Sequence, residues 1–364
     1  MSMLGKPGML KEVNSSLVER LISQEGPISI PKVAEITKLS IPTITKIVDN
    51  LKERQRICSV GYTSDGVGRK ALLYQINKDF GFIVALYYNS GKYLCRLTDI
   101  IGSILYEDVF PLDNTSTEAA TNSTIDAINA MLVKATSEVL AIGIGVPGAV
   151  TPDGNLFGIP KIDVWEDFNL KATLAEKFQT YIYVENDVKL SAVGYYLTYL
   201  SDEFDNIVYI YAGNGMGSGV IINKKLYKGS TNFSGELGFM APLSGVNPQR
   251  DFTREGGFLE SELNSYLNGK NVLNKNEETF INFFAAIAAN YTAIINPAAI
   301  VFGGEAFTEH FITGIRQRLN YYAPKIGIPR VIYDSHDKIG IHGLVLACIA
   351  EVNSGVQIVQ NGGV

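Results

Sequence analysis

Cysteine is scarce in this chain of 364 residues, and long hydrophobic runs are missing. The three cysteines, Cys58, Cys95 and Cys348, lie far apart. So small and odd a set does not fit a secreted disulfide scaffold and fits a reducing compartment. No apolar run approaches the roughly 18 residues that a membrane span requires, and residues 1–14 lack the apolar core of a signal peptide. The sequence therefore predicts a cytoplasmic protein that does not associate with membranes.

Charge is divided unevenly along the chain. Residues 1–80 contain 12 Lys and Arg against 8 Asp and Glu, whereas residues 81–364 contain 19 against 29. A small basic segment joined to a large acidic one is expected of a polyanion-binding head on a soluble body. The excess is modest, and taken alone chance explains it equally well. With 46% hydrophobic and 19% charged residues, the composition excludes wholesale disorder.

The first 80 residues show three short helical patterns followed by two strand-like runs. The helices are expected at 15–24, 31–37 and 41–54, and the strands at 57–62 and 71–76. Pro31 suits a first helical turn, and Ser40 is a candidate N-cap for the third helix. Only three residues separate the second and third helices, which is the spacing of a helix-turn-helix. The pattern predicts a winged helix-turn-helix domain over residues 1–80.

In such a domain the third helix enters the major groove of DNA and presents its polar N-terminal residues to the bases. The basic end of the turn between the strands can reach phosphate or the minor groove. The residues expected to contact DNA are Ser40, Pro42, Thr43, Thr45, Lys46 and Asn50 on the helix, with Arg69 and Lys70 on the wing. Each residue alone fits a solvated surface equally well. The whole arrangement favours double-stranded operator DNA as a partner.

From about residue 82 onward, strands alternate with helices, which is typical of an α/β body. A five-strand pattern with glycine-rich turns begins near residue 82 and recurs near residue 207, which indicates two similar lobes, at about 81–200 and 201–364. The expected strands are 82–88, 93–98, 103–109, 141–146, 181–184, 207–212, 219–222 and 299–302. The expected helices are 117–135, 170–178, 188–200, 257–267, 277–295 and 309–322.

Four features of the body carry residues suited to chemistry. Alternating glycines in the run 213–219 allow a backbone to approach phosphate or sugar oxygens, although a flexible hairpin explains them equally well. Glu185-Asn186-Asp187 follows a strand and offers a carboxylate that can accept a proton from a hydroxyl. Spacing alone favours Asp187 as the N-cap of the next helix. Glu236 and Glu260 lie beside glycines and suit hydrogen bonds to sugar hydroxyls, although solvent-facing glutamates are commoner.

The order of these motifs resembles the ROK family of repressors, open reading frames and sugar kinases. The motifs that carry the resemblance, behind the predicted winged helix, are Ile144-Gly145-Val146-Pro147-Gly148, Glu185-Asn186-Asp187, the run 213–219, Gly235-Glu236-Leu237-Gly238 and Val301-Phe302-Gly303-Gly304. The chain is most similar to the transcriptional-repressor branch, whose familiar members are xylose and N-acetylglucosamine repressors. The resemblance implies an actin-like (ribonuclease H-like), two-lobed α/β fold with a sugar in the cleft, and a homodimer or dimer of dimers.

The resemblance also implies roles for single residues. The positions that match sugar contacts are Asn186, Asp187, Glu236 and Glu260. Asp187 also matches the general base of the family's kinases. The positions that match stretches holding ATP phosphates and adenosine are Gly213, Gly215, Gly217, Gly303 and Gly304. We expect the base and these glycines to be vestigial.

Two departures from the family pattern argue against catalysis. Kinases of the family begin the body with Asp-x-Gly-Gly-Thr, and the matching stretch here is Tyr87-Tyr88-Asn89-Ser90-Gly91. The carboxylate needed for Mg²⁺ is missing, and a tyrosine should obstruct phosphate. The family's zinc ligands are also missing, because Phe239 replaces a histidine and residues 251–258 contain no cysteine. We therefore expect no catalytic residue, no metal and no ATP or other cofactor.

The leading hypothesis is a DNA-binding transcriptional regulator, a repressor of sugar-utilisation genes that responds to a sugar or sugar derivative in a degenerate kinase-like cleft. Sugar binding would shift the spacing of two wings in a homodimer, to the extent that the ligand prefers one arrangement. Two alternatives stay open. One is an ATP-dependent ROK sugar kinase that retains Asp187, and the other is a regulator whose body only dimerises.

Overall fold

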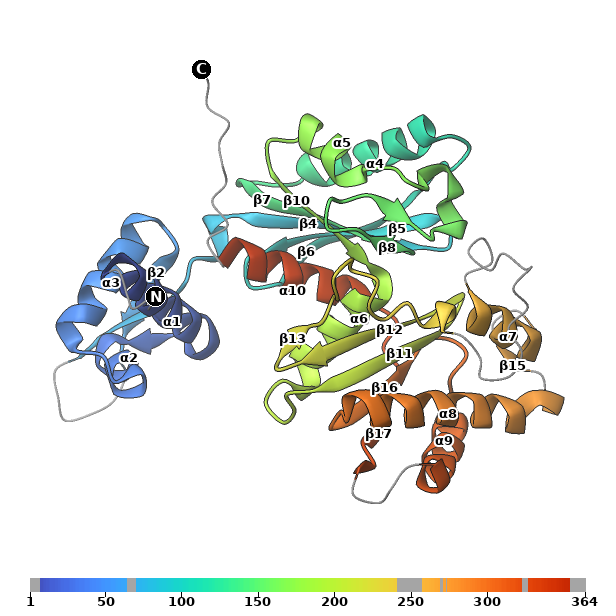
Figure 1. Ribbon diagram of the computed structural model, residues 1–364. Coiled ribbons are helices and arrows are strands. Elements are labelled where there is room, and N and C mark those ends of the chain that lie inside the picture. The colour runs from blue at the N-terminus through green and yellow to red at the C-terminus, as the bar shows by residue number, and fades with distance from the viewer. Residues whose placement is uncertain are drawn as a thin grey trace, which may run out of the picture.

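The computed structural model describes residues 7–63, 70–240, 257–268, 271–272, 274–322 and 327–353. An N-terminal unit lies beside two stacked α/β lobes, and each lobe is built on a five-stranded sheet (Figure 1). Two of the segments singled out in the sequence fall outside the described residues, namely Arg69 on the expected wing and the run 251–256.

Three helices and a small antiparallel sheet form the N-terminal unit. Its elements are α1 (Pro7–Glu25), β1 (Ile28–Ser29), α2 (Ile30–Thr37), α3 (Ile41–Glu53), β2 (Ile57–Tyr62) and β3 (Leu72–Ile76). The strand order is β1-β3-β2, with both pairings antiparallel. The three helices and the two strands predicted here are confirmed, but the first helix begins at Pro7 rather than at residue 15. The short strand β1 was not expected from the sequence.

Local sequence determines where α3 begins. The Ser40 hydroxyl accepts a hydrogen bond from the backbone N–H of Thr43 at 3.3 Å, as expected of an N-cap. Pro42 occupies the first turn, where a missing N–H costs no intrahelical hydrogen bond. The buried face consists of Ile44, Ile47, Val48 and Leu51. The polar face of the helix is therefore left at the surface.

The first lobe is a mixed sheet with the strand order β10-β7-β4-β5-β6. Its strands are β4 (Phe82–Asn89), β5 (Lys92–Asp99), β6 (Ile104–Pro111), β7 (Val139–Val146) and β10 (Tyr181–Asn186). The first three pair antiparallel, and β7 and β10 run parallel to β4. One face is covered by α4 (Thr117–Leu132) and α5 (Leu170–Lys177), with the short strands β8 (Ala149–Val150) and β9 (Leu156–Phe157) and the 3-10 segment η2 (Pro160–Trp165) at one end.

The second lobe repeats this topology, which confirms the recurrence predicted from the sequence. Its strands are β11 (Ile207–Gly213), β12 (Gly215–Ile222), β13 (Lys225–Leu226), β16 (Ala299–Gly303) and β17 (Arg330–Asp334). The order β13-β12-β11-β16-β17 again joins three antiparallel strands to two parallel ones. The helices packed on its outer face are α7 (Phe258–Tyr266), α8 (Glu277–Ile295) and α9 (Glu309–Tyr322). Two short antiparallel strands of two residues each, β14 (Leu267–Asn268) and β15 (Asn271–Val272), follow α7.

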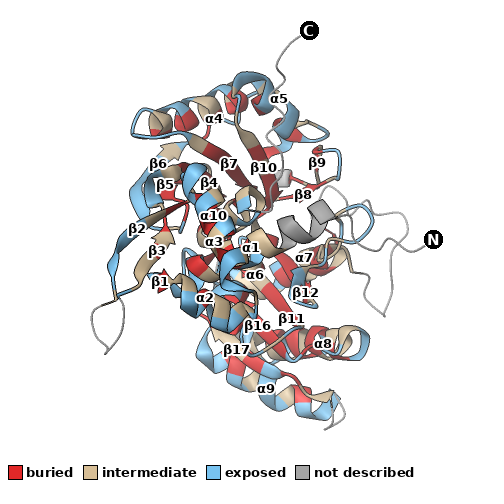
Figure 2. Cartoon of the chain, turned by 90° about the vertical axis from the view of Figure 1, so that its left-hand side faces the viewer, coloured by how far each residue is buried: buried red, intermediate tan, exposed pale blue. Residues whose placement is uncertain are grey.

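Two helices lie between the sheets, α6 (Asp187–Tyr195) after β10 and α10 (Ile339–Asn353) after β17 (Figure 1). They pack against each other with their backbones in contact, because a Cβ atom on Gly343 would overlap the carbonyl oxygen of Leu190. Figure 2 shows that the strands on both sides of this layer are largely buried. Neither β17 nor α10 was predicted. The sequence of α10 is apolar all round, so it lacks the one-sided pattern by which surface helices are found.

The glycine run 213–219 is a tight hairpin rather than a loop. Strand β12 begins at Gly215, and Gly213 pairs with Gly215 across a turn that contains only Asn214. The predicted strand, 219–222, is therefore four residues too short. Glycine is required along β12 because a Cβ atom on Gly219 would overlap the side chain of Ala192 in α6. The absence of side chains lets the strand approach the helix closely.

Within the described residues, α8 is the one helix long and apolar enough to span a bilayer by length and composition. The core helices of globular proteins pass the same test, and Phe280, Phe284 and Ala288 of α8 are fully buried in the second lobe. All three cysteines are free thiols, and Cys95 and Cys348 are buried.

Candidate functional site

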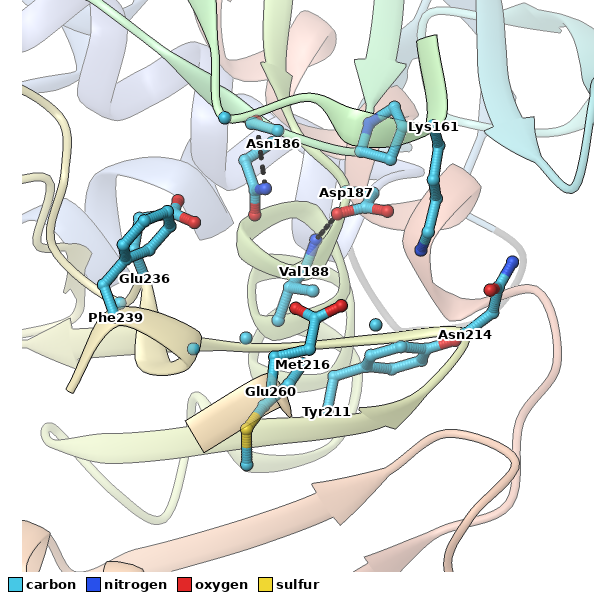
Figure 3. A pocket seen from close by; sticks show the side chains of 17 residues that line it. Lys161, Asn186, Asp187, Val188, Tyr211, Asn214, Met216, Glu236, Phe239 and Glu260 are labelled. Carbon is cyan, nitrogen blue, oxygen red and sulfur yellow. Dashed lines mark hydrogen bonds between the residues drawn. The ribbon is translucent and has the colours of Figure 1, made fainter. Parts of the chain in front are cut away.

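A cavity lies where the end of β10, the β11–β12 hairpin and the start of α7 meet (Figure 3). We call it the first cavity. Its volume is about 60 Å³. Its lining residues are Pro147, Gly148, Gly158, Lys161, Asn186, Asp187, Val188, Tyr211, Asn214, Gly215, Met216, Gly217, Gly235, Glu236, Gly238, Phe239 and Glu260. The fold therefore brings together four polar residues singled out in the sequence from three separate segments, namely Asn186, Asp187, Glu236 and Glu260.

Asn186 is the N-cap residue of α6. Its Oδ1 accepts a hydrogen bond from the N–H of Lys189 at 3.0 Å, and its Nδ2 donates to the carbonyl of Gly148 at 3.0 Å. The N-cap is thus Asn186, and the prediction that Asp187 caps the helix is wrong. Both bonds hold the amide group rigid at the cavity wall, which leaves one N–H and one lone pair for a ligand.

Asp187 is the first residue of α6 and faces the cavity. Its Oδ1 accepts a hydrogen bond from the N–H of Val188 at 2.8 Å. Burial raises the pKa of this carboxyl to about 6, and the positive charge of Lys161 opposes the rise. The neighbouring Tyr87 donates its hydroxyl to the carbonyl of Asp187 at 3.3 Å. The stretch that departs from the kinase pattern therefore contacts the backbone of Asp187.

Glu236 enters the cavity from the segment before the 3-10 turn η4 (Leu237–Phe239). The ammonium group of Lys189, only 1% exposed, lies 3.4 Å from Glu236 Oε1 and also donates to the carbonyl of Asn232. Burial raises the pKa of Glu236 to about 7, although Lys189 opposes the shift. This buried pair holds Glu236 against α6.

Glu260 lies in the first turn of α7 and accepts a hydrogen bond from the backbone N–H of Met216. Burial raises its pKa to about 7, and Lys161 again opposes the shift. In Figure 3, Lys161, Asp187 and Glu260 point toward the same space. Lys161 was not predicted as a site residue. It lies in η2, a 3-10 segment with no motif around it, and only the fold reveals that it faces two carboxylates.

Phe239 forms part of an aromatic wall at the first cavity. Its ring centroid lies 5.3 Å from that of Phe233, which stacks on Phe157 at 5.7 Å. Glu185, by contrast, does not line the cavity. Its side chain is 1% exposed, and it forms an ion pair with Lys228 at 2.5 Å. The first residue of the Glu185-Asn186-Asp187 motif is therefore structural, and the other two face the cavity.

A second cavity, of about 500 Å³, adjoins the first. Tyr87, Tyr88, Asn89 and Ser90 line it, so the stretch that departs from the kinase pattern forms one of its walls. The other walls are lined mainly by Tyr209, Tyr211, Gly304, Glu305, Tyr333, Asp334 and His336. Its walls are therefore rich in phenol hydroxyls and carboxylates.

The five glycines matched to nucleotide-binding positions differ in what they face. Gly215 and Gly217 line the first cavity and Gly304 lines the second. The space beside Gly213 is occupied by the carboxylate of Glu305, and the space beside Gly303 by the hydroxyl of Tyr209. These two glycines thus make room for side chains of the chain itself. Among the residues that the structure describes, no three His, Cys, Asp or Glu side chains are grouped to hold a metal.

Protein stability is expected to fall as the pH rises from about 5 to 8, partly because of these carboxyl groups. The folded-state pKa values of Asp187, Glu236 and Glu260 are raised to about 6, 7 and 7. The folded protein therefore binds more protons than the unfolded chain in this range, and ionisation costs stability. Urea unfolding at both pH values measures the change. Glu260→Gln should make the dependence shallower, whereas the exposed control Glu176→Gln should not. Equal slopes for all three proteins would contradict the assignment.

Six of the residues expected to contact DNA lie on α3 or at its N-cap. Ser40, Pro42 and Lys46 are exposed, and Thr43, Thr45 and Asn50 are half-buried along the same helix. The hydroxyls of Ser40 and Thr43 lie 2.8 Å apart, and Thr45 donates to the carbonyl of Ile41 at 2.9 Å. Lys70 is exposed just before β3, at the end of the wing that the structure describes.

Comparison with known proteins gives one family and several relatives. Residues 90–250 match the ROK family. The xylose repressor of Bacillus subtilis (strain 168) is 30% identical over 234 residues, which cover 64% of this chain and 61% of the repressor. The chain therefore matches about three fifths of that relative's length. The xylose repressor of Caldicellulosiruptor bescii is 24% identical over an alignment covering 96% of this chain and 98% of that protein. A solved ROK family transcriptional regulator, a homolog of the E. coli MLC protein, matches with a TM-score of 0.75 over 95% of this chain and 97% of that chain, at 18% identity.

Proposed function

The chain carries a ROK family domain in an actin-like, kinase-type α/β body, and on this premise we propose that it is a DNA-binding transcriptional repressor of sugar-utilisation genes. In this proposal residues 1–80 are the DNA-binding domain and residues 81–364 are the sugar sensor and dimerisation body. The effector is a sugar or sugar derivative bound in the cleft. The protein works in the cytoplasm as a homodimer or dimer of dimers, without a metal or cofactor.

The architecture of the N-terminal unit supports DNA binding. Three helices followed by a β-hairpin, with α3 exposed along its polar face, are the parts of a winged helix-turn-helix. Lys46 on α3 and Lys70 just before β3 are exposed, so both can donate to phosphate oxygens. Relatives named xylose repressor support the same conclusion.

The chemistry of the first cavity supports a sugar ligand. Carboxylates and an amide that converge beside an aromatic ring suit a ligand with many hydroxyl groups and an apolar face. We assign sugar contacts to Asn186, Asp187, Glu236 and Glu260. The raised pKa values of Asp187, Glu236 and Glu260 are expected of a pocket kept dry for hydrogen bonding.

The same cleft argues against phosphoryl transfer. Phosphoryl transfer depends on a metal ion and on positioned donors around the phosphate. At the end of β4, where kinases need a carboxylate and glycines, this chain has tyrosines, and the hydroxyl of Tyr87 contacts the backbone of Asp187. We infer that Asp187 binds a hydroxyl without activating it. Production of ADP from ATP, Mg²⁺ and hexoses that is lost in Asp187→Ala would overturn this point.

A continuous path of packed elements supports communication between the cleft and the N-terminal unit, and this observation carries the proposal. Asn186 and Asp187 begin α6, and α6 packs directly on α10. Asn353, the last residue of α10, accepts a hydrogen bond from Arg56 at 2.6 Å, and Arg56 is also paired with Glu19 of α1 at 2.5 Å. A ligand that moves α6 therefore has a mechanical connection to the DNA-binding unit, which is what an allosteric regulator needs.

The experiment that tests the proposal is a gel-shift and footprinting assay. The DNA consists of promoter fragments from the chain's own gene and its neighbours, and the assay is run at low salt with and without candidate sugars. Binding that a sugar weakens is the expected result. If no fragment binds under either condition, the proposal fails.

Lys46→Ala is expected to weaken DNA binding and to lower the slope of log K against log salt by about 1 per protomer, because one phosphate contact is lost. Titration of a labelled fragment at several salt concentrations measures the slope. Lys78→Ala is the matched control, because Lys78 is exposed outside α3 and the wing. An unchanged slope for Lys46→Ala would remove α3 from the interface.

A further inference from the structure

The two cavities in the cleft adjoin each other. They share the lining residues Pro147, Lys161, Asp187, Val188, Tyr211 and Asn214, so a ligand in one cavity lies beside the other. The first cavity holds about 60 Å³ and the second about 500 Å³. Pockets for small organic ligands usually measure roughly 300–1,000 Å³. The second cavity therefore provides most of the space available to a ligand in the cleft.

The second cavity is poorly suited to a nucleotide. Its described walls carry four carboxylates, Asp187, Glu305, Asp334 and Asp337, against the single lysine Lys161. A triphosphate would meet a field of the same sign. Glycine positions are also closed by aromatic side chains. The space beside Gly303 is taken by the Tyr209 hydroxyl and that beside Gly340 by Tyr87, while that beside Gly304 is taken by the carbonyl oxygen of Ala212 and the Tyr211 ring.

The same walls are well suited to an uncharged ligand rich in hydroxyl groups. Tyr209 donates its hydroxyl to Asp334 at 2.8 Å, and Tyr211 donates to Glu305 at 2.7 Å. His336 contacts the other oxygen of Asp334 at 2.7 Å. These bonds fix the phenol groups, and each phenol oxygen still has lone pairs that accept hydrogen bonds from ligand hydroxyls. The tyrosine rings offer flat apolar surfaces for the C–H faces of a sugar ring.

We propose that the effector is an oligosaccharide, with one sugar unit whose hydroxyl groups enter the first cavity and with the next unit in the second. This inference rests on the proposed function, because it takes the ligand of the cleft to be a sugar. Lys161 lies at the junction, where its ammonium group can donate to the oxygen that links the two units. The second cavity is thus an additional saccharide subsite in the position where a kinase would hold its nucleotide.

Isothermal titration with matched saccharides tests the inference on the full-length protein. The probes are xylose, xylobiose and xylotriose, glucose, maltose and cellobiose, and N-acetylglucosamine with its β1,4-linked dimer. At least one disaccharide is expected to bind about tenfold or more tightly than its own monosaccharide, which corresponds to about 1.4 kcal/mol. ATP with Mg²⁺ is expected not to compete with it.

A variant that fills only the second cavity separates the two subsites. Asn89 is exposed, lines the second cavity and does not line the first. Asn89→Trp is expected to abolish the advantage of the disaccharide while leaving the affinity for the monosaccharide unchanged. Asn129→Trp, on the exposed face of α4, is the matched control and should leave both affinities unchanged.

The outcomes distinguish this inference from the proposed function. If monosaccharides bind and release DNA but disaccharides bind no more tightly, the extra subsite is wrong and the sugar-responsive repressor stands. If ATP competes with the disaccharide, the second cavity is a nucleotide site and the inference fails. If no saccharide binds while promoter DNA does, both the subsite and sugar sensing are overturned and only DNA binding remains.

Discussion

The Gly343→Ala variant is expected to lose more than about 4 kcal/mol of unfolding free energy. A Cβ atom at this position would overlap the carbonyl oxygen of Leu190 and lie 2.7 Å from the amide nitrogen of Gly194. Both are backbone atoms of α6, which is buried between the sheets, so neither can rotate aside. The helices would have to separate, and the packing of Leu344, which is fully buried, would be lost. Chemical denaturation followed by circular dichroism measures the loss.

Gly314→Ala is the matched control for this prediction, because Gly314 also lies within a helix, α9. The atoms nearest to its Cβ position belong to the side chain of Ile281, with Cδ1 at 2.6 Å. A side-chain terminus can change rotamer, so the expected loss is below about 2 kcal/mol. Equal losses of unfolding free energy in the two variants would mean that the backbones of α6 and α10 do not pack in direct contact. In that case the mechanical path from the cleft to Arg56 would lose its basis.

Elements determined by local interactions could be predicted from the sequence. The start of α3 depends on Ser40 and Pro42, which act within one turn, and the buried positions recur at helical spacing. The repeated five-strand pattern was visible for the same reason. The repeat also implies a helix after the last strand of the second lobe, as α6 follows the last strand of the first. A helix predicted from this repeat after β17 corresponds to α10, although α10 is apolar on all sides and shows no helical pattern of its own.

Interpretations that depend on tertiary contacts were less successful. The alternating pattern predicts that the glycines of the run 213–219 approach a ligand, yet Gly219 is required by the side chain of Ala192 and Gly213 by the carboxylate of Glu305. The sequence does not reveal which atoms occupy the space beside a glycine. Lys161 was missed because its position between Asp187 and Glu260 arises only when the lobes come together. The four polar residues assigned to the sugar were found through the resemblance rather than through spacing.

The Glu236→Gln variant is expected to bind the effector about tenfold more weakly than the wild type while binding DNA equally well. A hydrogen bond from a ligand hydroxyl to a buried carboxylate contributes about 1.5–3 kcal/mol, and an amide of the same shape supplies less. Glu236 faces the cavity and is held there by Lys189. The N-terminal unit lies elsewhere, so its contacts with DNA should be unaffected. Isothermal titration with the effector and gel shifts without it measure the two affinities.

The pH dependence of binding separates a direct contact from a structural effect. Hydroxyl donors favour the ionised form of a carboxyl group. The pKa of Glu236 is raised to about 7, so at pH 6 the group must lose a proton before it accepts such bonds. Wild-type affinity is therefore expected to rise by up to about tenfold from pH 6 to pH 8 on account of this group. Glu236→Gln should remove that part of the rise.

Glu185→Gln is the control that makes this prediction specific. Glu185 is also a buried glutamate paired with a lysine, Lys228, but it does not line the cavity. Its replacement should lower stability through the loss of a buried ion pair. Because the charge of Glu185 helps to raise the pKa of Glu236, the rise in affinity should move toward lower pH but should still occur. If Glu236→Gln kept both the affinity and the pH profile of the wild type, the ligand would have to bind outside the first cavity. If both variants lost the pH dependence together, the effect would come from disturbed packing around α6 rather than from a carboxylate that touches the sugar.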